Sequence, residues 1–373
     1  DLWVDDARLV ILNILEAVTY GACVNKNTSL ELAEYNTSLN LWEITLSNCK
    51  KNNRFNIQAK CIINATGPWV NSVLENNLKL SPKYNIRLIK GSHIVVPKLD
   101  KHLHGYAYVL QNTDNRIIFA IPYEKDFTLI GTTESEEKLS KEKLSISKQE
   151  IDYLLYCYNH YFKTKLQVSD IKYTYSGIRP LFYQPNTNSS ENTRDYKLDI
   201  YSDKLPLISI YGGKITTYRV LASNVIKILT KINLNFNLNF NLKINSDKQL
   251  VKLPGGDLEA SPDKAKAVVG YSRANHQAFV TKLLVLYPWL SQDLAERYTR
   301  TYGSLVYKFL KQCKSQESLG YHFGSGLYQC EVDYLVNNEY ADCVEDVLFR
   351  RTKLGLYLSI QQTAMLKKYL ENC

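Results

Sequence analysis

The sequence lacks several features that would indicate a membrane, metal-binding or nucleic-acid-binding protein. No apolar run is long enough to span a bilayer, which excludes a spanning helix within these residues and makes any membrane contact peripheral. The eight cysteines form no C-x-x-C pair and have no ligand-like spacing with histidine, so we expect free thiols in a reducing compartment and no bound metal. Lysine and arginine form no long block, which argues against a nucleic-acid partner.

Methionine is also scarce: it occurs once, at Met365, and the sequence begins at Asp1. We therefore expect an internal or C-terminal piece of a longer product. The 373 residues are enough for two or three domains, and contents of 45% hydrophobic and 22% charged residues are ordinary for globular proteins. The formal charge of +9 favours an anionic partner in general: a phosphorylated metabolite, an acidic membrane face or, against the scattered lysines, a nucleic acid.

Two glycine-containing turns each join a predicted strand to a predicted helix. The apolar run at 207–211 precedes Gly212 and Gly213. The run at 61–65 likewise precedes Gly67. Because glycine has no side chain, a flat ligand can lie against bare N–H groups at the positive end of a helix dipole, and in open α/β sheets ligands bind at the carboxyl ends of strands. An ordinary turn between core elements stays open as the alternative for either unit.

The spacing of apolar residues predicts a sheet-rich first part and a helical last third. Ser147 with Glu150, and Ser359 with Gln362, have the spacing of capping boxes that open helices. The segment 232–245 alternates like a strand, but its two-letter monotony indicates a low-complexity linker. The predicted elements are a helix at 6–17, a β-meander at 22–65, a helix at 69–76, antiparallel strands between 86 and 134, a helix from 147, strands at 171–182 and 193–201, and helices from 276 to the end.

Isolated polar residues in the strand-rich segments are the sharper functional signal. His93 lies inside an apolar strand, where a lone histidine is most often a satisfied core or edge residue. Arg179 has apolar neighbours, and Arg194 can simply pair with Asp195 or with solvent. Together with Lys214, however, the two arginines suit a phosphate group, because guanidinium planes bind its oxygens in bidentate fashion.

A series of segments places these residues in a wider pattern: IRLIKGSHIVVP, IPY with IGTT, YSGIRP, TRDYKLDI, GGKITTYR, LPGG, RTYGS and RRTKLGL. In that order they resemble the FAD-dependent glycerol-3-phosphate dehydrogenases, the respiratory type that passes electrons to quinone. The similarity runs from Asp5 to the final helix, and the 232–245 insert fits it poorly. So many matches in order identify the family far better than either glycine turn alone.

The resemblance implies an α/β fold. It consists of the later part of a glutathione-reductase-like FAD-binding domain, an antiparallel substrate-binding sheet and a C-terminal all-α domain. We place a partial FAD-binding domain at 1–85, the substrate or cap domain at 86–176, a return to the FAD-binding domain at 177–231, a low-complexity linker at 232–250 and the helical domain at 251–373.

Site roles follow from the resemblance, position by position. His93, Arg179 and Lys214 match catalytic positions, and Arg194 and Glu134 match substrate-binding positions, where the cations would hold the phosphate. His93 would accept the proton of the C2 hydroxyl while a hydride passes from C2 to flavin N5, which gives dihydroxyacetone phosphate. Lys214 would also stabilise the anionic reduced flavin. The backbone positions that would approach the flavin are Ala65, Thr66, Gly67, Gly212, Gly213 and Thr216.

The sequence departs from the family in two respects. The N-terminal strand with G-x-G-x-x-G, which seats the FAD pyrophosphate, has no counterpart, since the only G-x-G is at 324–326 in the helical region. Glu134 stands where the family usually has aspartate. Two alternatives therefore stay open: a non-catalytic remnant of a split or decaying gene, and another flavin-dependent oxidase acting on an amine or a 2-hydroxy acid.

The resemblance also implies partners and a location. The expected partners are glycerol 3-phosphate and quinone, with a peripheral membrane contact, a homodimer as the candidate assembly, and no nucleic acid. The expected location is the cytoplasm, at the inner face of the cell membrane.

Overall fold

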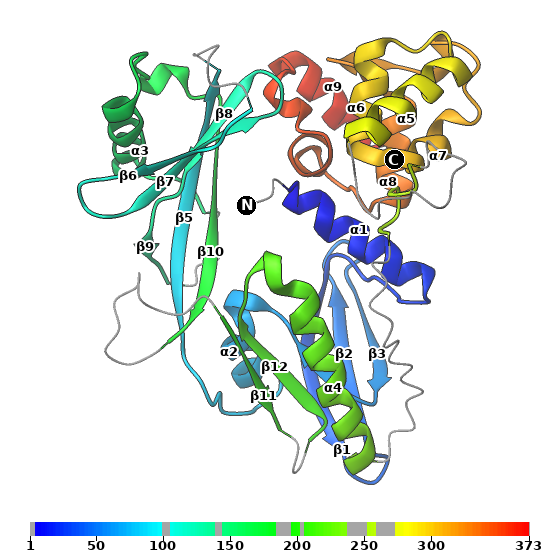
Figure 1. Cartoon of the computed structure of the whole chain (residues 1–373). Helices are drawn as coiled ribbons and strands as arrows, with labels where there is room; N and C mark the ends of the chain where they lie inside the picture. The colour runs from blue at the N-terminus through cyan, green and yellow to red at the C-terminus, as the bar shows by residue number, and fades with distance from the viewer. Residues whose placement is uncertain are drawn as a thin grey trace. The chain divides into compact units, whose positions relative to one another are not determined.

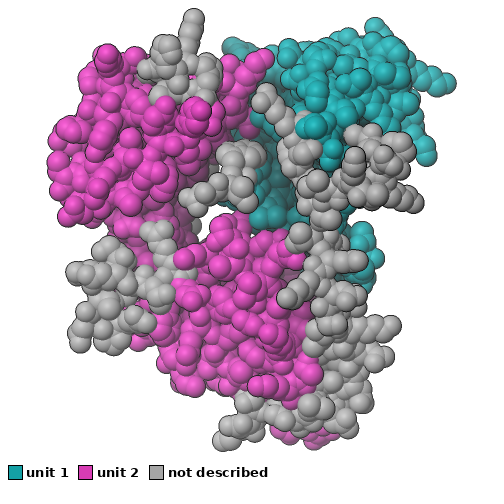
Figure 2. Space-filling view, in the orientation of Figure 1, with its two compact units in different colours: residues 1–26, 245–373 teal, residues 27–244 magenta. Residues whose placement is uncertain are grey.

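The structure, a computed structural model, describes residues 4–98, 105–138, 144–183, 195–201, 205–236, 252–258 and 273–372 (Figure 1). The chain divides into two compact units, coloured separately in Figure 2. We call residues 27–244 the sheet unit, and residues 1–26 together with 245–373 the helical unit. The N-terminal helix therefore groups with the C-terminal helices, which its sequence did not indicate.

The sheet unit begins with the predicted meander. Strands β1 (Thr28–Asn36), β2 (Leu41–Asn48) and β3 (Asn53–Ala59) pair in antiparallel order. Asn40 and Asn52, at the two connecting turns, have positive φ values, a conformation that asparagine tolerates better than most residues. The asparagine-rich segments between the alternating runs are therefore the hairpin turns that the sequence indicated.

A three-stranded sheet follows, in the order β11 (Tyr196–Ile200), β12 (Leu207–Gly212) and β4 (Ile62–Asn64). β12 and β4 run parallel, and Ile208 pairs with Ile63. Helix α4 (Tyr218–Phe236) packs on this sheet through Val225 and Ile232 (Figure 1). The short helical segments η1 (Gly67–Trp69), α2 (Val70–Ser72) and η2 (Val73–Asn77) follow β4. They form the helix that was predicted at 69–76.

Helix α4 corrects the prediction of a linker from residue 232. The helix continues through Ile232 to Phe236, so the first residues of the repetitive segment are helical. Ile232 is buried against Val225 and Ile208, because a spacing of seven residues keeps it on the helix face that covers the sheet. The rest of the proposed linker, residues 237–250, lies outside the described residues.

The third sheet has the strand order β10–β5–β8–β7–β6, and β9 also pairs with β5. Every pairing in it is antiparallel, as predicted. Helix α3 (Lys148–Tyr161) opens with the Ser147–Glu150 capping box and packs on one face of the sheet (Figure 1). β10 spans the predicted domain limit at residue 176, and α4 spans the predicted limit at residue 231; the limits at residues 85 and 250 stay predictions. The strands are β5 (Ile86–Pro97), β6 (Tyr108–Gln111), β7 (Ile117–Tyr123), β8 (Phe127–Gly131), β9 (Ser135–Glu136) and β10 (Tyr173–Phe182), and η4 (Val168–Asp170) precedes β10.

The helical unit contains the predicted succession of helices, and α9 opens with the Ser359–Gln362 capping box. It is not purely helical, because β13 (His322–Gly324) and β14 (Leu327–Tyr328) form a hairpin whose turn is the G-x-G at 324–326. Among the described residues, none of the helices has both the length and the apolar character needed to cross a bilayer. The helical elements are α1 (Asp6–Thr19), α5 (Arg273–Leu286), α6 (Gln292–Tyr302), η7 (Gly303–Val306), α7 (Tyr307–Leu310), η8 (Glu317–Leu319), α8 (Gln329–Asn338), η9 (Asp346–Arg351), η10 (Leu354–Leu356) and α9 (Ile360–Leu370).

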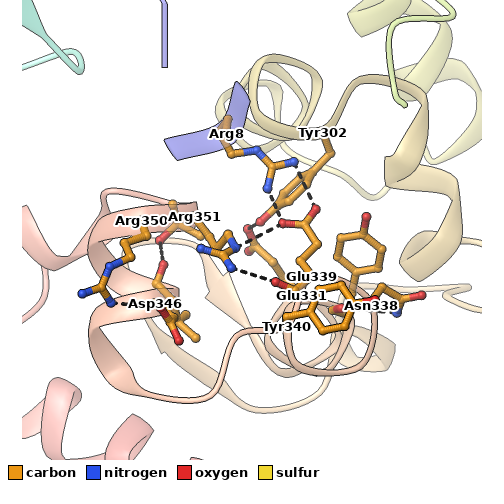
Figure 3. Close-up of polar contacts among 12 residues, drawn as sticks. Arg8, Tyr302, Glu331, Asn338, Glu339, Tyr340, Asp346, Arg350 and Arg351 are labelled. Carbon is orange, nitrogen blue, oxygen red and sulfur yellow. Dashed lines mark hydrogen bonds and ion pairs between the residues drawn. The ribbon is translucent and has the colours of Figure 1, made fainter. Parts of the chain in front are cut away.

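A buried charge cluster attaches α1 to the rest of the helical unit (Figure 3). Nη2 of Arg8 donates to Oε1 of Glu339 at 3.0 Å, and the Arg8 guanidinium lies 5.1 Å from the ring centre of Tyr302. Nη2 of Arg351 donates to the carbonyl of Glu339 at 2.8 Å. Because both charges of the Arg8–Glu339 pair are almost fully buried, each depends on the other for its stability. These contacts explain why residues 5–19 belong to this unit.

Candidate active site

His93 lies on the face of β5 that points away from helix α3. Side chains alternate along a strand, and Ile94 and Val96 pack against α3. His93 is therefore on the opposite face, where it pairs in register with Tyr175 of β10 and with Gly131 of β8. The rings of His93 and Tyr175 stack, with centroids 4.8 Å apart and planes 9° from parallel. The stack fixes the orientation of the imidazole.

Glycines leave this face of the sheet bare. A Cβ atom at Gly131 would overlap the imidazole of His93. At Gly91, a Cβ atom would lie 2.6 Å from Nη2 of Arg179. Gly177 pairs with Gly91, and its own Cβ position is open space. Glycine inside a strand weakens the sheet and commonly marks a close approach. Here two of the three glycines make room for His93 and Arg179.

Arg179 lies on the same face as His93 and beside two residues that follow β8. Its Nη2 donates a hydrogen bond to Oγ1 of Thr132 at 2.8 Å, and its Nη1 lies 3.6 Å from Oε1 of Glu134. Both charged side chains are partly exposed, at 29% and 22%. The structure therefore brings together three of the predicted site residues, His93, Arg179 and Glu134. It also shows that Glu134 partly balances the arginine charge.

The surroundings of His93 disfavour its charged form. Burial, and secondarily the positive charge of Arg179, lower its pKa to about 4. Its Nδ1 is buried and has no hydrogen-bond partner among the described residues. The imidazole is therefore neutral at pH 7 and retains a free hydrogen-bonding position.

We expect the low pKa of His93 to reduce stability in acid. Between pH 6.5 and 4 the unfolded chain binds a proton at this residue and the folded chain does not, so stability falls as the pH falls through this window. At about 1.4 kcal/mol per pKa unit, the loss is at most roughly 3 kcal/mol. Urea unfolding of the wild-type protein and of His93→Asn, at pH 7 and pH 4, measures it. An equal stability difference between the two proteins at both pH values would contradict a neutral, half-buried imidazole in the folded protein.

The two glycine turns lie at one edge of the mixed sheet. Because β4 and β12 are parallel neighbours, the turns that follow them meet at the same end of the sheet. Gly67 has a φ of 58°, and a Cβ atom there would meet nothing within 4 Å. A Cβ atom at Gly212 would lie 3.0 Å from the carbonyl oxygen of Asp195 and 3.4 Å from that of Pro180. This edge therefore lies beside the residue that follows Arg179.

The remaining predicted residues are less fully defined. Lys214 is exposed in the turn after β12, where its carbonyl accepts hydrogen bonds from the backbone N–H and the hydroxyl of Thr217. Ala65, Thr66 and Thr216 are exposed, and Oγ1 of Thr66 donates to Oδ1 of Asn64 at 2.6 Å. Arg194 lies outside the described residues.

Sequence reasoning missed Thr132 and Tyr175 as members of this site. The polar pair that ends the IGTT segment was used as a family match, and its first threonine proves to be the hydrogen-bond partner of Arg179. Tyr175 depends on strand register, which pairs it with His93 across two distant segments. The isolated glycine at 91 was the available signal for Thr132, because a Cβ atom there would lie 2.6 Å from Oγ1 of Thr132.

Two family models match the chain. One, described as FAD dependent oxidoreductase, matches residues 1–197, and the other, described as the C-terminal domain of alpha-glycerophosphate oxidase, matches residues 248–371. The glycerol-3-phosphate dehydrogenase of Pseudomonas aeruginosa is 40% identical over 374 residues, which cover 100% of this chain and 68% of the relative. The aerobic glycerol-3-phosphate dehydrogenase of Escherichia coli K12 is 38% identical, with 99% of this chain and 69% of the relative covered.

A relative named for a different substrate is also similar. The D-erythritol 1-phosphate dehydrogenase of Brucella abortus is 36% identical and covers 100% of this chain and 70% of its own length. The fold agrees with a solved structure, that of the glycerol-3-phosphate dehydrogenase from Bacillus halodurans complexed with FAD. The match has a TM-score of 0.75 at 23% identity, and covers 99% of this chain and 72% of that one.

The chain therefore belongs to the FAD-dependent oxidoreductases. Within that family, the resemblance to the glycerol-3-phosphate dehydrogenases is confirmed by the full-length similarity to their members. The predicted α/β fold, the status as an enzyme and FAD as the cofactor are confirmed with it.

Proposed function

We propose that this protein oxidises sn-glycerol 3-phosphate to dihydroxyacetone phosphate, with FAD as the hydride acceptor. The observation that carries the proposal is a neutral, half-buried imidazole, His93, on the same glycine-cleared sheet face as the guanidinium of Arg179. Relatives that bear this activity in their names, at 38% and 40% identity, support the choice of substrate.

The described residues divide the chemistry between binding and proton transfer. Arg179 offers a planar, permanently charged donor to the phosphate, and Thr132 and Glu134 hold its orientation. Exposed Lys214, and Arg194 beyond the described residues, add positive charge for the same group. His93 accepts the proton of the C2 hydroxyl, because the neutral imidazole has a nitrogen lone pair available to bind it. The stack on Tyr175 keeps the ring oriented for that transfer.

The glycine turns fit the cofactor. At Gly67 the chain leaves open space where any other residue would carry a side chain, and Gly212 and Gly213 have positive φ values, which glycine adopts readily. Ala65, Thr66 and Thr216 complete the edge that would hold FAD. When bound, FAD supplies the two-electron acceptor for the hydride from C2.

The proposal also covers the electron acceptor, the membrane contact and the oligomeric state. We propose that quinone reoxidises the flavin, that the protein makes a peripheral contact with the inner face of the cell membrane, and that it assembles as a homodimer. The similarity to aerobic glycerol-3-phosphate dehydrogenases supports quinone, and the formal charge of +9 supports contact with an acidic membrane face.

A second substrate deserves a direct comparison, because one relative is named for D-erythritol 1-phosphate. That compound is also a polyol phosphate with a secondary hydroxyl group. Arg179 and His93 would serve it in the same roles, so the phosphate site does not separate the two substrates.

Purified protein tests the proposal in three measurements. We expect visible flavin absorbance, reduction of a soluble quinone with sn-glycerol 3-phosphate, and a lower kcat/KM with D-erythritol 1-phosphate. A higher kcat/KM with the erythritol compound would transfer the assignment to that substrate. Turnover with dioxygen but not with quinone would make the protein an oxidase. Colourless, inactive protein would support the non-catalytic remnant instead.

A further inference from the structure

A buried carboxylate lies behind the candidate active site, on the α3 side of the same sheet. Oε1 of Glu150 accepts hydrogen bonds from Oγ of Ser92 at 2.8 Å and from Oγ1 of Thr133 at 2.7 Å. Its Oε2 accepts from the backbone N–H of Ser147 at 2.8 Å and lies 3.2 Å from Nζ of Lys90. Both oxygens are therefore fully used by groups from three segments of the chain.

The carboxylate holds two strands together at the point where their pairing ends. Oγ1 of Thr133 accepts from the backbone N–H of Ser92 at 2.9 Å, and the N–H of Thr133 donates to the carbonyl of Ser92 at 3.2 Å. Oγ of Ser92 also lies 2.8 Å from Oγ of Ser176 on β10. Ser92 is fully buried and Thr133 is 3% exposed. These bonds therefore form in an interior of low dielectric, where a lost partner is costly.

Two of the four residues that bond to Glu150 are next to residues of the candidate active site. Ser92 precedes His93, and Thr133 follows Thr132, the hydrogen-bond partner of Arg179. Because consecutive side chains of a strand point to opposite faces, a bond that fixes Ser92 on the α3 side also fixes His93 on the active-site side. Through these two neighbours, the Glu150 carboxylate restrains both His93 and Thr132.

The capping box alone does not account for a buried charge at this position. Helix α9 opens with the same type of box, built from Ser359 and Gln362, and there a neutral amide fills the role. Burial opposes ionisation of Glu150, yet the hydrogen bonds from Ser147, Thr133, Ser92 and Lys90 lower its pKa to about 2. Glu150 is therefore a permanent carboxylate, and its four partners exceed what a helix cap needs.

We propose that Glu150 is a positioning residue of the active site, which fixes His93 through Ser92 and the Arg179 partner Thr132 through Thr133. The inference rests on the proposed function for its catalytic consequence. Its structural part, that Glu150 sets the surroundings of His93, does not require a substrate.

The test compares Glu150→Gln with Ser147→Ala. Glutamine can still cap the helix but has one acceptor oxygen instead of two and no charge. We expect Glu150→Gln to lower kcat about tenfold with the FAD content unchanged. We also expect it to raise the pKa of His93 by at least one unit toward 6.5, as followed by NMR of the imidazole, because a less firmly held strand lets water reach a ring whose pKa is lowered mainly by burial. Ser147→Ala removes the cap hydroxyl, at a stability cost of about 1 kcal/mol, and should leave kcat and the His93 pKa unchanged.

Three results would overturn the proposal. They are a folded Glu150→Gln protein with wild-type kcat and His93 pKa, equal losses in Ser147→Ala, and a pKa change without any change in kcat. If Glu150→Gln does not fold, Thr133→Val, which removes the bridging hydroxyl, takes its place, and Thr133→Ser, which keeps it, should restore both readouts. Wild-type protein that oxidises neither polyol phosphate would refute the proposed function instead, while the His93 pKa would still test the positioning.

Discussion

Replacement of His93 by asparagine should lower kcat for sn-glycerol 3-phosphate by about 10²- to 10⁴-fold, the usual range for loss of a general base. The amide can occupy the space beside Tyr175 and Gly131, but it cannot accept a proton near neutral pH. KM should change little, because Arg179 and its partners remain in place. Steady-state kinetics with a quinone acceptor measure both constants.

His276→Asn is a matched control for this substitution. Burial also lowers the pKa of His276, so it shares that property with His93, but it lies on α5 in the helical unit. We expect its kcat to equal that of the wild-type protein. A His93→Asn enzyme that keeps more than a third of the wild-type kcat, with normal FAD content, would show that another group takes the proton.

Much of the fold could be predicted from short sequence patterns, because helix caps and turns depend on interactions between residues that are close in sequence. The box formed by Ser147 and Glu150 begins helix α3, since a side-chain oxygen at that spacing satisfies the free N–H groups of the first turn. The asparagines at positions 40 and 52 lie in the hairpin turns because their φ values are positive. Each feature depends on a few neighbouring residues.

Features that depend on distant residues were less accessible. The alternation at 232–245 indicated a strand or a linker, whereas packing of Ile232 against Ile208 extends the helix. The attachment of α1 to the helical unit depends on Arg8 meeting Glu339, more than three hundred positions away. The local pattern of apolar and polar residues in either segment does not indicate which distant residue it will contact.

The candidate site shows the same division. His93, Arg179 and Glu134 could be named from the sequence because the family pattern marks them, and the structure places the last two 3.6 Å apart. The contribution of Glu150 could not be named beyond its cap, because its bonds to Ser92 and Thr133 exist only once β5, β8 and α3 pack together. Burial and strand register, rather than residue type, give that carboxylate its second role.

Loss of the Arg179 guanidinium should weaken substrate binding strongly. We expect Arg179→Gln to reduce kcat/KM by about 30- to 5,000-fold, mainly through KM, since removal of one partner of a hydrogen-bonded charge pair costs about 2–5 kcal/mol and each 1.4 kcal/mol is a factor of ten. Glu134 would then repel the phosphate without a neighbouring positive charge. Arg179→Lys, which keeps the charge but not the planar fork, should fall between the wild-type protein and Arg179→Gln.

Gly91→Ala provides an independent test of the same guanidinium without changing a charge. The added Cβ atom would lie 2.6 Å from both Nη2 of Arg179 and Oγ1 of Thr132, so the arginine must leave its position or lose this hydrogen bond. KM should rise toward the value for Arg179→Gln. Gly177→Ala, on the paired strand, is the control because its Cβ atom would enter open space. Equal KM values for Gly91→Ala and the wild-type protein would place the phosphate away from Arg179. Lys214 would then be the residue expected to bind the phosphate.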